Sequence, residues 1–362
     1  MATNPISSDA APASGGGIRV FIVDDSSLVR AVFSRLIEAE PGLELAGVAT
    51  TAEDAISQLG SLHVHVILLD LEMPGMGGMQ ALPQITRLAG SAKVLVVSSL
   101  TEEGAVHSIQ ALAAGAADTL LKPEPGGFDQ AYRERLVARI RALGRRPLRR
   151  AEGDPKPAAP AVAIRPSPAG FRARIVAIGA STGGVQATGM VLAQLPAELG
   201  VPILITQHLP PMFTDAYAGQ LQEISGRKVL VARDGMPLVA DQIFLAPGDA
   251  HLCLKDGKPQ PGIKLDRKVS SSGYVPSVDR MFESLAKVYR DGAMGVVLTG
   301  MGRDGTEGAQ ALIDAGSAVV VQNEVSSVVW GMPGSIAKAG LASAVLHPRD
   351  IATRIALCAK AD

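Results

Sequence analysis

Between residues 18 and 143, short apolar runs alternate five times with longer segments whose apolar residues recur at helical spacing. Strands that alternate with helices in this way form βαβ units around a parallel sheet. The pattern predicts strands at 18–25, 44–50, 64–70, 93–99 and 118–122, and helices between them, for example at 27–40 and 128–143. This stretch is therefore expected to fold as an α/β domain with five parallel strands.

The pattern stops at residues 144–171, where Pro, Ala and Arg dominate and apolar periodicity is absent. This composition predicts a flexible linker, partly extended by its prolines. From residue 172 to 362 the alternation returns and predicts a second α/β domain with a mostly parallel sheet. Its expected strands are 174–180, 201–208, 229–233, 242–246, 251–255, 294–300 and 318–322, and its clearest helices are 277–290 and 305–315.

Composition narrows the picture further. A chain of 362 residues suits two domains, and its net charge of -1 gives no argument for binding nucleic acid or a membrane surface. Cys253 and Cys358 are not spaced as a disulfide or metal cluster, which fits a reduced compartment. Residues 1–17 are small, polar and Gly-rich, so we expect disorder rather than a secretory signal. No apolar run is long enough to span a bilayer. We expect a soluble, cytoplasmic monomer.

The first domain carries polar residues at its strand ends. Asp24 and Asp25 end the first strand, Asp70 the third and Ser98 the fourth, while Lys122 follows the fifth. The carboxyl ends of parallel strands share one edge, so these side chains should converge there. Crowded carboxylates without His or Cys suit Mg²⁺. The cation and a Lys ammonium would stabilise a phosphoryl group moving onto Asp70, which Ser98 would then sense.

A single Asp at a strand end usually caps a helix, but the joint spacing disfavours that reading. These residues resemble the response-regulator receiver family over about residues 18–143, which implies a doubly wound, flavodoxin-like fold. The resemblance implies that Asp70 is phosphorylated, that Asp24 and Asp25 help it hold Mg²⁺, and that Lys122 contacts the phosphoryl group. Family members often carry an aromatic switch residue three positions before the lysine. Thr119 stands there in this chain.

The second domain offers a candidate nucleophile, Ser181, in a Gly-Ala-Ser-Thr-Gly-Gly loop between an apolar strand and a helix. Gly-rich loops of this kind also bind phosphate, so the motif alone is ambiguous. It has neither the dinucleotide spacing nor the Gly-x-Ser-x-Gly of a nucleophile elbow. His208 ends the next strand and is the plausible base, because a serine hydroxyl needs a neighbouring proton acceptor.

A carboxylate would complete the site by orienting the imidazole. Asp304 follows the strand at 294–300, although it could instead cap the next helix. Asp249, Asp279 and Asp241 are other acidic candidates, and spacing alone does not separate Asp304 from Asp279. The Met301–Gly302 turn could offer backbone N–H groups to an oxyanion.

Six motifs in order resemble the C-terminal domain of the chemotaxis protein-glutamate methylesterases over about residues 172–360. They are Gly-Ala-Ser-Thr-Gly-Gly, Gln-His-Leu-Pro, Ala-Pro-Gly-Asp-Ala-His, Pro-Ser-Val-Asp, Leu-Thr-Gly-Met-Gly-Arg-Asp-Gly and Gly-Met-Pro. The resemblance implies that Ser181 is the nucleophile, His208 the base and Asp304 its orienter. It also places the Met301 amide in the oxyanion hole with Thr182 close by, and requires no cofactor in this domain.

The implied activity is hydrolysis of γ-glutamyl methyl esters on chemotaxis receptors, with release of methanol, and deamidation of receptor glutamines. The receiver, phosphorylated by a chemotaxis histidine kinase, would relieve obstruction of the Ser181 loop. Two alternatives stay open: a second domain that only binds a partner, and the same enzyme in another chemosensory-like pathway. The chain departs from the family pattern at Val275, Asn323 and Gln220. None of these is a catalytic position, although they could alter receptor contacts or domain docking.

Overall fold

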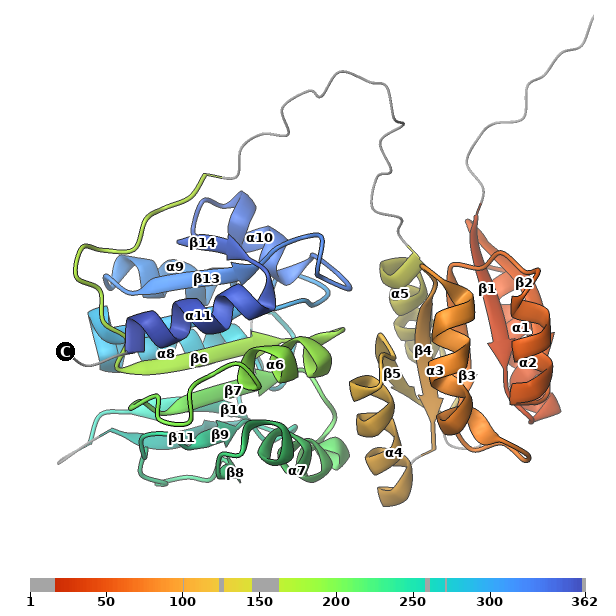
Figure 1. Cartoon of the computed structure of the whole chain (residues 1–362), viewed down its shortest axis with the longest axis horizontal. Coiled ribbons are helices and arrows are strands. Elements are labelled where there is room, and N and C mark those ends of the chain that lie inside the picture. Colours follow the sequence, from red (N-terminus) through yellow and green to blue (C-terminus); the bar gives the residue numbers. More distant parts are fainter. Residues whose placement is uncertain are drawn as a thin grey trace, which may run out of the picture.

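The computed structural model describes residues 17–99, 101–123, 127–144, 163–257, 261–270 and 272–359. The predicted disordered N-terminus and most of the predicted linker lie outside the described residues. The described chain forms two α/β units, each built on its own parallel sheet (Figure 1). No helix of the described part of the chain is long and apolar enough to cross a membrane.

The N-terminal unit has five parallel strands in the order β2-β1-β3-β4-β5. All five predicted strands are present, with ends that move by one or two residues. The strands are β1 (Ile18–Val23), β2 (Leu43–Ala49), β3 (Val66–Asp70), β4 (Lys93–Ser98) and β5 (Asp118–Leu121). The helices are α1 (Ser27–Glu38), α2 (Ala52–Leu59), α3 (Gly77–Ala89), α4 (Glu102–Ala113) and α5 (Gln130–Gly144). Every residue of β3 is buried, as expected of a strand covered on both faces.

The C-terminal unit has seven parallel strands in the order β14-β13-β12-β6-β7-β9-β8, with an antiparallel pair, β10 and β11, beside them. The sheet strands are β6 (Ile175–Ala180), β7 (Ile203–Gln207), β8 (Val229–Val231), β9 (Ile243–Leu245), β12 (Ala293–Val297), β13 (Ala318–Gln322) and β14 (Ala344–Leu346). The pair is β10 (His251–Lys255) and β11 (Gly262–Asp266). The mostly parallel sheet is as predicted, whereas the short strands β11 and β14 were not.

Helices cover this second sheet. They are α6 (Gly184–Leu192), α7 (Thr214–Ser225), α8 (Val278–Tyr289), α9 (Thr306–Asp314), α10 (Met332–Lys338) and α11 (Pro348–Ala359), with short 3-10 turns η1 (Pro211–Phe213) and η2 (Arg290–Gly292). Helix α8 begins at a serine cap, because the Ser277 hydroxyl accepts a hydrogen bond from the backbone N–H of Arg280. The start of α8 lies next to the carboxylate of Asp304.

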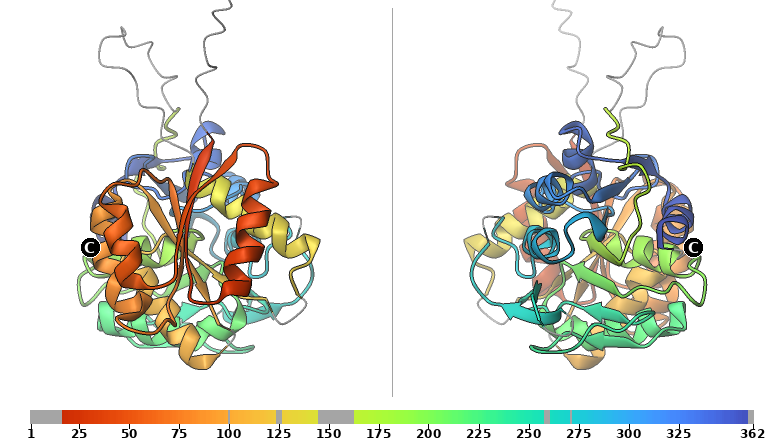
Figure 2. Two further views of the ribbon diagram at one scale, coloured as in Figure 1. Left: turned by 90° about the vertical axis from the view of Figure 1, so that its right-hand side faces the viewer. Right: turned by 90° about the vertical axis from the view of Figure 1, so that its left-hand side faces the viewer.

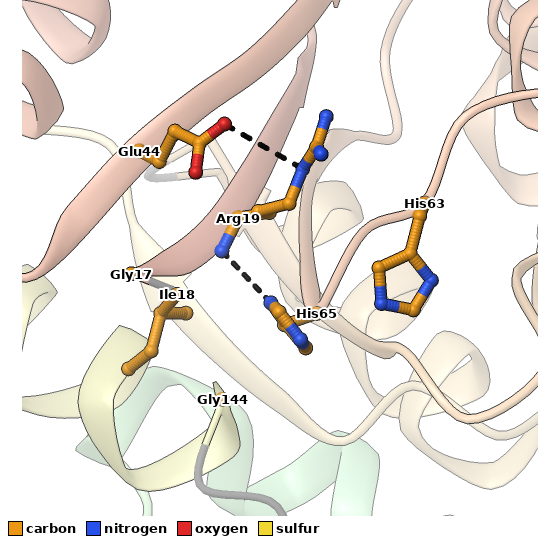
Figure 3. Close-up of a pocket in the computed structure, with 7 residues that line it drawn as sticks. All are labelled: Gly17, Ile18, Arg19, Glu44, His63, His65 and Gly144. Carbon is orange, nitrogen blue, oxygen red and sulfur yellow. Dashed lines mark hydrogen bonds and ion pairs between the residues drawn. The ribbon is translucent and has the colours of Figure 1, made fainter. Parts of the chain in front are cut away.

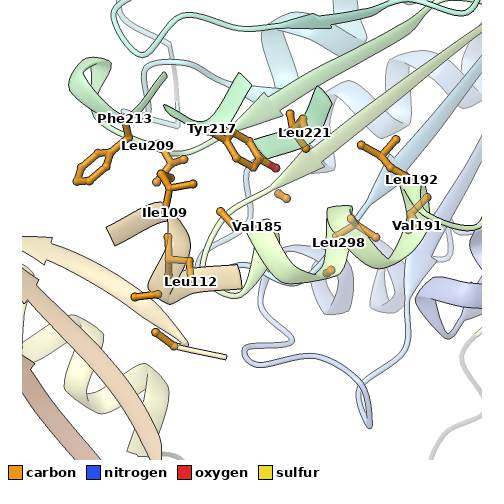
Figure 4. Packing of buried hydrophobic residues seen from close by; sticks show 14 of the residues in the cluster. Ile109, Leu112, Val185, Val191, Leu192, Leu209, Phe213, Tyr217, Leu221 and Leu298 are labelled. Atoms are coloured by element: carbon orange, nitrogen blue, oxygen red, sulfur yellow. The ribbon is translucent and has the colours of Figure 1, made fainter. Parts of the chain in front are cut away.

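The two units are docked. Helix α4 and strand β5 of the first unit face α6, α7 and η1 of the second, beyond the carboxyl ends of the second sheet's strands (Figure 1). Side views show one unit in front of the other (Figure 2). The contact is apolar: Ile109 and Leu112 of α4 belong to the same buried cluster as Val185, Leu209 and Phe213 (Figure 4). Burial of aliphatic surface of this kind stabilises the docked arrangement.

Candidate functional site

The register of the second sheet brings the predicted nucleophile and base side by side. Strands β6 and β7 are parallel neighbours in which Ala180 pairs with Gln207. Ser181 and His208 each follow their strand by one residue, so both lie at the same edge on adjacent strands. The backbone N–H of His208 donates to the Ala180 carbonyl at 3.0 Å, and the Gln207 side chain donates to the Ser181 carbonyl at 2.8 Å.

The third predicted residue meets the histidine from the other side. His208 Nε2 lies 2.8 Å from Asp304 Oδ2, and the Asp304 carboxylate is fully buried. His208 Nδ1 is buried and makes no hydrogen bond in the described part of the chain. The carboxylate therefore fixes the proton on Nε2 and leaves Nδ1 as the basic nitrogen.

Asp304 is held by the start of α8. Its carboxylate accepts the Ser277 hydroxyl at 2.8 Å, the Val278 N–H at 2.7 Å and the Asp279 N–H at 3.3 Å. Burial would raise the pKa of Asp304, but the hydrogen bond and charge of His208 and the Val278 N–H outweigh it. They hold that pKa well below its ordinary range. Asp304 is therefore the ionised group that an imidazolium requires.

The structure separates Asp304 from Asp279, which spacing could not. Asp279 does not meet His208: its carboxylate accepts the Gly308 N–H at 2.7 Å, at the first turn of α9. Burial, with the Asp304 charge beside it, raises the pKa of Asp279 to about 7. Of two buried carboxyls in contact, one binds a proton more readily than the other, and here that one is Asp279. The other two acidic alternatives also lie elsewhere: Asp241 accepts the N–H of Leu199, and Asp249 pairs with Arg267.

The Ser181 loop is tightly packed. The Ser181 N–H donates to the Thr299 carbonyl at 3.0 Å. A Cβ on Gly300 would lie 2.8 Å from the Ser181 Cβ, so only glycine permits this approach. Gly183 has a φ of +78°, and a Cβ there would meet Val328 at 2.6 Å. These contacts fix the loop geometry, and sequence reasoning identified neither Gly300 nor Ser277 as part of the site.

The predicted oxyanion group lies nearby. Met301 follows Gly300 in the turn before Asp304, and its N–H donates no hydrogen bond to any described residue. The Thr182 hydroxyl, predicted to support this region, is instead engaged by the first domain: it donates to Asp118 Oδ2 at 2.6 Å.

The docked domain thus touches the nucleophile loop directly. Besides the Thr182 bond, the Gly183 N–H donates to the Ala117 carbonyl at 2.9 Å. Asp118 also lies 3.5 Å from Arg139 Nε on α5. Two residues of the loop that carries Ser181 are therefore hydrogen-bonded to the start of β5.

The predicted acidic cluster of the first domain is also assembled. Asp24, Asp25 and Asp70 each offer a carboxylate oxygen, and these oxygens lie within 4.8 Å of one another. Lys122 Nζ lies 2.6 Å from Asp70 Oδ2 and 3.1 Å from Asp24 Oδ2. Asp24 is buried, with the Lys122 ammonium beside its Oδ2, and Asp25 is exposed next to it. Three carboxylates whose oxygens converge in this way fit the all-oxygen ligation that Mg²⁺ requires.

Burial dominates the ionisation of Asp70. It raises the pKa of Asp70 to about 6, although the Lys122 hydrogen bond and charge oppose it. At Lys122 burial disfavours the charge, but Asp70 and Asp24 outweigh burial, so the pKa of Lys122 is raised. The pair is ionised at neutral pH.

Ser98 and Thr119, two further positions singled out from the sequence, lie on the neighbouring strands β4 and β5. Ser98 is buried at the end of β4, and its hydroxyl has no hydrogen-bond partner among the described residues. Thr119 is buried in β5 between Asp118 and the Lys122 end of that strand, and its hydroxyl is likewise unpaired there.

Other histidines lie outside this chemistry. A hollow of about 440 Å³ at the start of β1 is lined by Arg19, Glu44, His63 and His65, at the opposite end of the sheet from Asp70 (Figure 3). His251 is fully buried, and its Nδ1 accepts the Ser277 N–H at 2.9 Å. It therefore supports the start of α8.

Known proteins resemble both units. The protein-family model described as CheB methylesterase matches residues 176–355, and the family model described as response regulator receiver domain matches residues 20–131. A protein-glutamate methylesterase/protein-glutamine glutaminase 2 from Caulobacter vibrioides is 42% identical, covering 94% of this chain and 98% of its own. A protein-glutamate methylesterase/protein-glutamine glutaminase 1 from Rhodospirillum rubrum is 36% identical, and the match covers 94% of this chain and 95% of the relative. The catalytic domain of Thermotoga maritima CheB methylesterase, a crystal structure, is 35% identical over 51% of this chain and 98% of its own, with a TM-score of 0.50.

Fold and comparisons together define an enzyme that carries a response-regulator receiver domain. The chain belongs to the protein-glutamate methylesterase/protein-glutamine glutaminase family. Membership makes it a hydrolase of chemotaxis signalling under response-regulator control.

Proposed function

We propose that this chain is a serine hydrolase that removes methyl groups from γ-glutamyl methyl esters of chemotaxis receptors, with Ser181 as nucleophile, His208 as base and Asp304 as its orienter. The observation that carries the proposal is the 2.8 Å contact between His208 Nε2 and a fully buried, ionised Asp304, at the strand edge that also bears Ser181. That arrangement leaves Nδ1 unprotonated for the serine proton.

In the proposed reaction, Ser181 Oγ attacks the ester carbonyl carbon while its proton passes to His208 Nδ1. The tetrahedral oxyanion is stabilised by the free Met301 N–H, and one such donor contributes roughly 3–4 kcal/mol to barrier lowering. The carbon–oxygen bond to the methoxy group breaks, and His208 returns the proton so that methanol leaves. Water then attacks the acyl carbon and gives its proton to His208. The bond between that carbon and Ser181 Oγ breaks, His208 returns the proton to Oγ, and the products are glutamate and free Ser181.

The same steps act on glutamine. The carboxamide carbonyl accepts the serine, and ammonia leaves with the proton from His208. The acyl-enzyme is identical to that formed from the ester, so the second half of the reaction does not change. Deamidation of receptor glutamines is therefore part of the proposal, in line with the glutaminase in the names of the relatives.

The receiver is proposed to hold the enzyme in a low-activity state. In support, Asp118 and Ala117 hydrogen-bond Thr182 and Gly183, the two residues after the nucleophile. An ester on a receptor must approach this loop, and the docked domain lies against it. Strand β5 connects the docked face with the proposed phosphorylation site, since Asp118 begins this strand and Lys122 follows its end.

Asp70 is the proposed phosphoryl acceptor, and a chemotaxis histidine kinase is the proposed donor. Mg²⁺ held by Asp24, Asp25 and Asp70 would neutralise charge on the phosphoryl oxygens during transfer. Lys122 would bind the phosphoryl group, and the unpaired Ser98 hydroxyl would donate to it. Lys122 would thereby exchange its present contacts with Asp70 and Asp24, shifting the end of β5 and loosening the docked face. We further propose that the receiver comprises residues 18–143 and the catalytic domain residues 172–362.

Methanol release from methylated receptor tests this function. Full-length chain supplied with a phosphoryl donor and Mg²⁺ should release methanol, and Ser181→Ala should reduce the rate to background. Ser61→Ala, at an exposed serine after α2 of the first domain, is the control and should behave as wild type. Equal rates for wild type and Ser181→Ala would reject the serine mechanism, and binding of receptor without turnover would favour a binding-only domain.

A further inference from the structure

The imidazole of His208 is stacked face to face on the ring of Tyr274. The ring centroids are 4.2 Å apart and the planes differ by 10°. Asp304 contacts one edge of the imidazole and so restrains it within its own plane. Tyr274 covers a face and restrains the tilt of that plane. The His208 side chain is only 8% exposed as a result of these neighbours.

Tyr274 also reaches the turn assigned to the oxyanion. A Cβ on Gly302 would lie 3.2 Å from the Tyr274 hydroxyl oxygen, so the phenol lies beside the Met301–Gly302 turn. One ring therefore lies against two parts of the site, the base and the neighbourhood of the oxyanion donor.

The backbone of Tyr274 is tied to the same groups that hold Asp304. The Ser270 hydroxyl donates to the Tyr274 carbonyl at 2.9 Å, and the Tyr274 N–H donates to Ser272 Oγ at 3.4 Å. Ser272 bonds in turn to Ser277 at 3.4 Å, and Ser277 donates to Asp304. These hydrogen bonds through Ser272 and Ser277 hold the backbone of Tyr274 at a fixed position relative to the Asp304 carboxylate.

Core packing does not explain this placement. Gly273 on one side is exposed, Val275 on the other side is 39% exposed, and Tyr274 belongs to none of the hydrophobic clusters of the described residues. Burial raises the pKa of the phenol, so the ring is neutral over the working range of the enzyme. A neutral aromatic face attracts a cation placed over it.

We propose that Tyr274 is a positioning residue of the hydrolase site: its ring fixes the plane of His208, keeping Nε2 on Asp304 and Nδ1 free for the serine proton, and stabilises the imidazolium formed in the reaction. The inference rests on the proposed function, because it assigns His208 as the base. It adds a residue that acts through His208 and does not touch the ester itself.

The test compares Tyr274→Phe, which keeps the stacked ring, with Tyr274→Leu, which removes it. Tyr289→Leu is the matched control, since Tyr289 is also half-buried and stacks on Arg174 at the far end of α8. Full-length proteins are assayed with a small acyl phosphate and Mg²⁺. The readouts are kcat and KM for methanol release, and the rate at which a fluorophosphonate labels Ser181, which requires no receptor.

Tyr274→Phe should stay within about twofold of wild type in every readout. Tyr274→Leu should lose about tenfold or more in kcat and in labelling rate, with KM unchanged. Tyr289→Leu should match wild type. The proposal is overturned if Tyr274→Leu matches wild type, if Tyr274→Phe loses as much as Tyr274→Leu, or if only KM changes. If the wild-type protein is labelled at Ser181 but releases no methanol, the proposed substrate is rejected. The labelling rates of the variants would still decide the role of Tyr274.

Discussion

The hydroxyl of Thr182 donates a 2.6 Å hydrogen bond to Asp118, joining the Ser181 loop to the receiver. Thr182 is the residue after the proposed nucleophile, Ser181. Asp118 begins the strand whose other end is followed by Lys122, the proposed partner of the phosphoryl group. A four-residue strand therefore connects the phosphorylation site with the loop that the receiver covers.

Asp118→Ala should raise the activity of the unphosphorylated enzyme. Hydrogen bonds to charged groups contribute roughly 1.5–3 kcal/mol, so losing this one should weaken docking and raise basal methanol release by about tenfold. The rate with saturating phosphoryl donor should not change, because docking is already released. Asp54→Ala, on α2 away from the docked face, is the control and should leave the basal rate as it is. An unaltered basal rate in Asp118→Ala would show that this contact does not restrain the enzyme.

Asp304→Asn and Asp279→Asn should differ sharply although the two carboxyls are neighbours. Asp304 is ionised and orients His208, so its amide should lower kcat by about 10²–10⁴-fold. Asparagine also presents an NH₂ group to donors such as Val278 N–H, which should cost about 1–3 kcal/mol of stability.

The pKa of Asp279 is raised to about 7, so near neutral pH it binds a proton far more readily than Asp304, and asparagine imitates its protonated form. Asp279→Asn should therefore keep kcat within about fivefold. Steady-state kinetics and chemical denaturation of both variants check this pair. A larger loss in Asp279→Asn than in Asp304→Asn would reverse the assignment.

Asp70→Asn should stabilise the protein, and more so as pH rises. The pKa of Asp70 is raised to about 6 from 3.8, so the folded state binds this proton more tightly than the unfolded state. The favourable contribution is complete below about pH 4 and is lost as pH rises through about 6. Above that, wild type buries a charge that asparagine lacks.

In chelator, we expect the stability gain of Asp70→Asn over wild type to grow by about 1–3 kcal/mol between pH 4 and pH 8. Adding Mg²⁺ at pH 8 should reduce the difference in stability between Asp70→Asn and wild type, since a cation offsets the carboxylate charge. Thermal melts at several pH values provide the measurement. A gain that shrinks with rising pH would contradict the pKa shift.

Apolar periodicity was sufficient to predict both sheets, because their central strands are buried on both faces and read as unbroken aliphatic runs. Strands β11 and β14 escaped prediction for the opposite reason. Gly262–Asp266 alternates apolar and polar residues over only five positions, and Ala344–Leu346 is three residues long at a sheet edge. Segments this short give a weak periodic signal.

The site was partly readable from strand ends, which set where Ser181, His208 and Asp70 must lie. Spacing could not choose between Asp304 and Asp279, since that choice depends on which carboxyl meets the imidazole across 96 residues of sequence. Tyr274 and Gly300 were missed because their roles come from ring stacking and close backbone approach. Docking of Asp118 on Thr182 likewise depends on the placement of two domains, which no local pattern encodes.

The most direct measurement follows fluorophosphonate labelling of the full-length chain by mass spectrometry, with and without a phosphoryl donor and Mg²⁺. We predict a single modified residue, Ser181, and a labelling rate that rises about tenfold or more when Asp70 is phosphorylated. Asp70→Ala should remove the rise and leave the slow basal labelling. Labelling at another residue, or an equal rate in both states, would contradict an enzyme whose serine is restrained by the docked receiver.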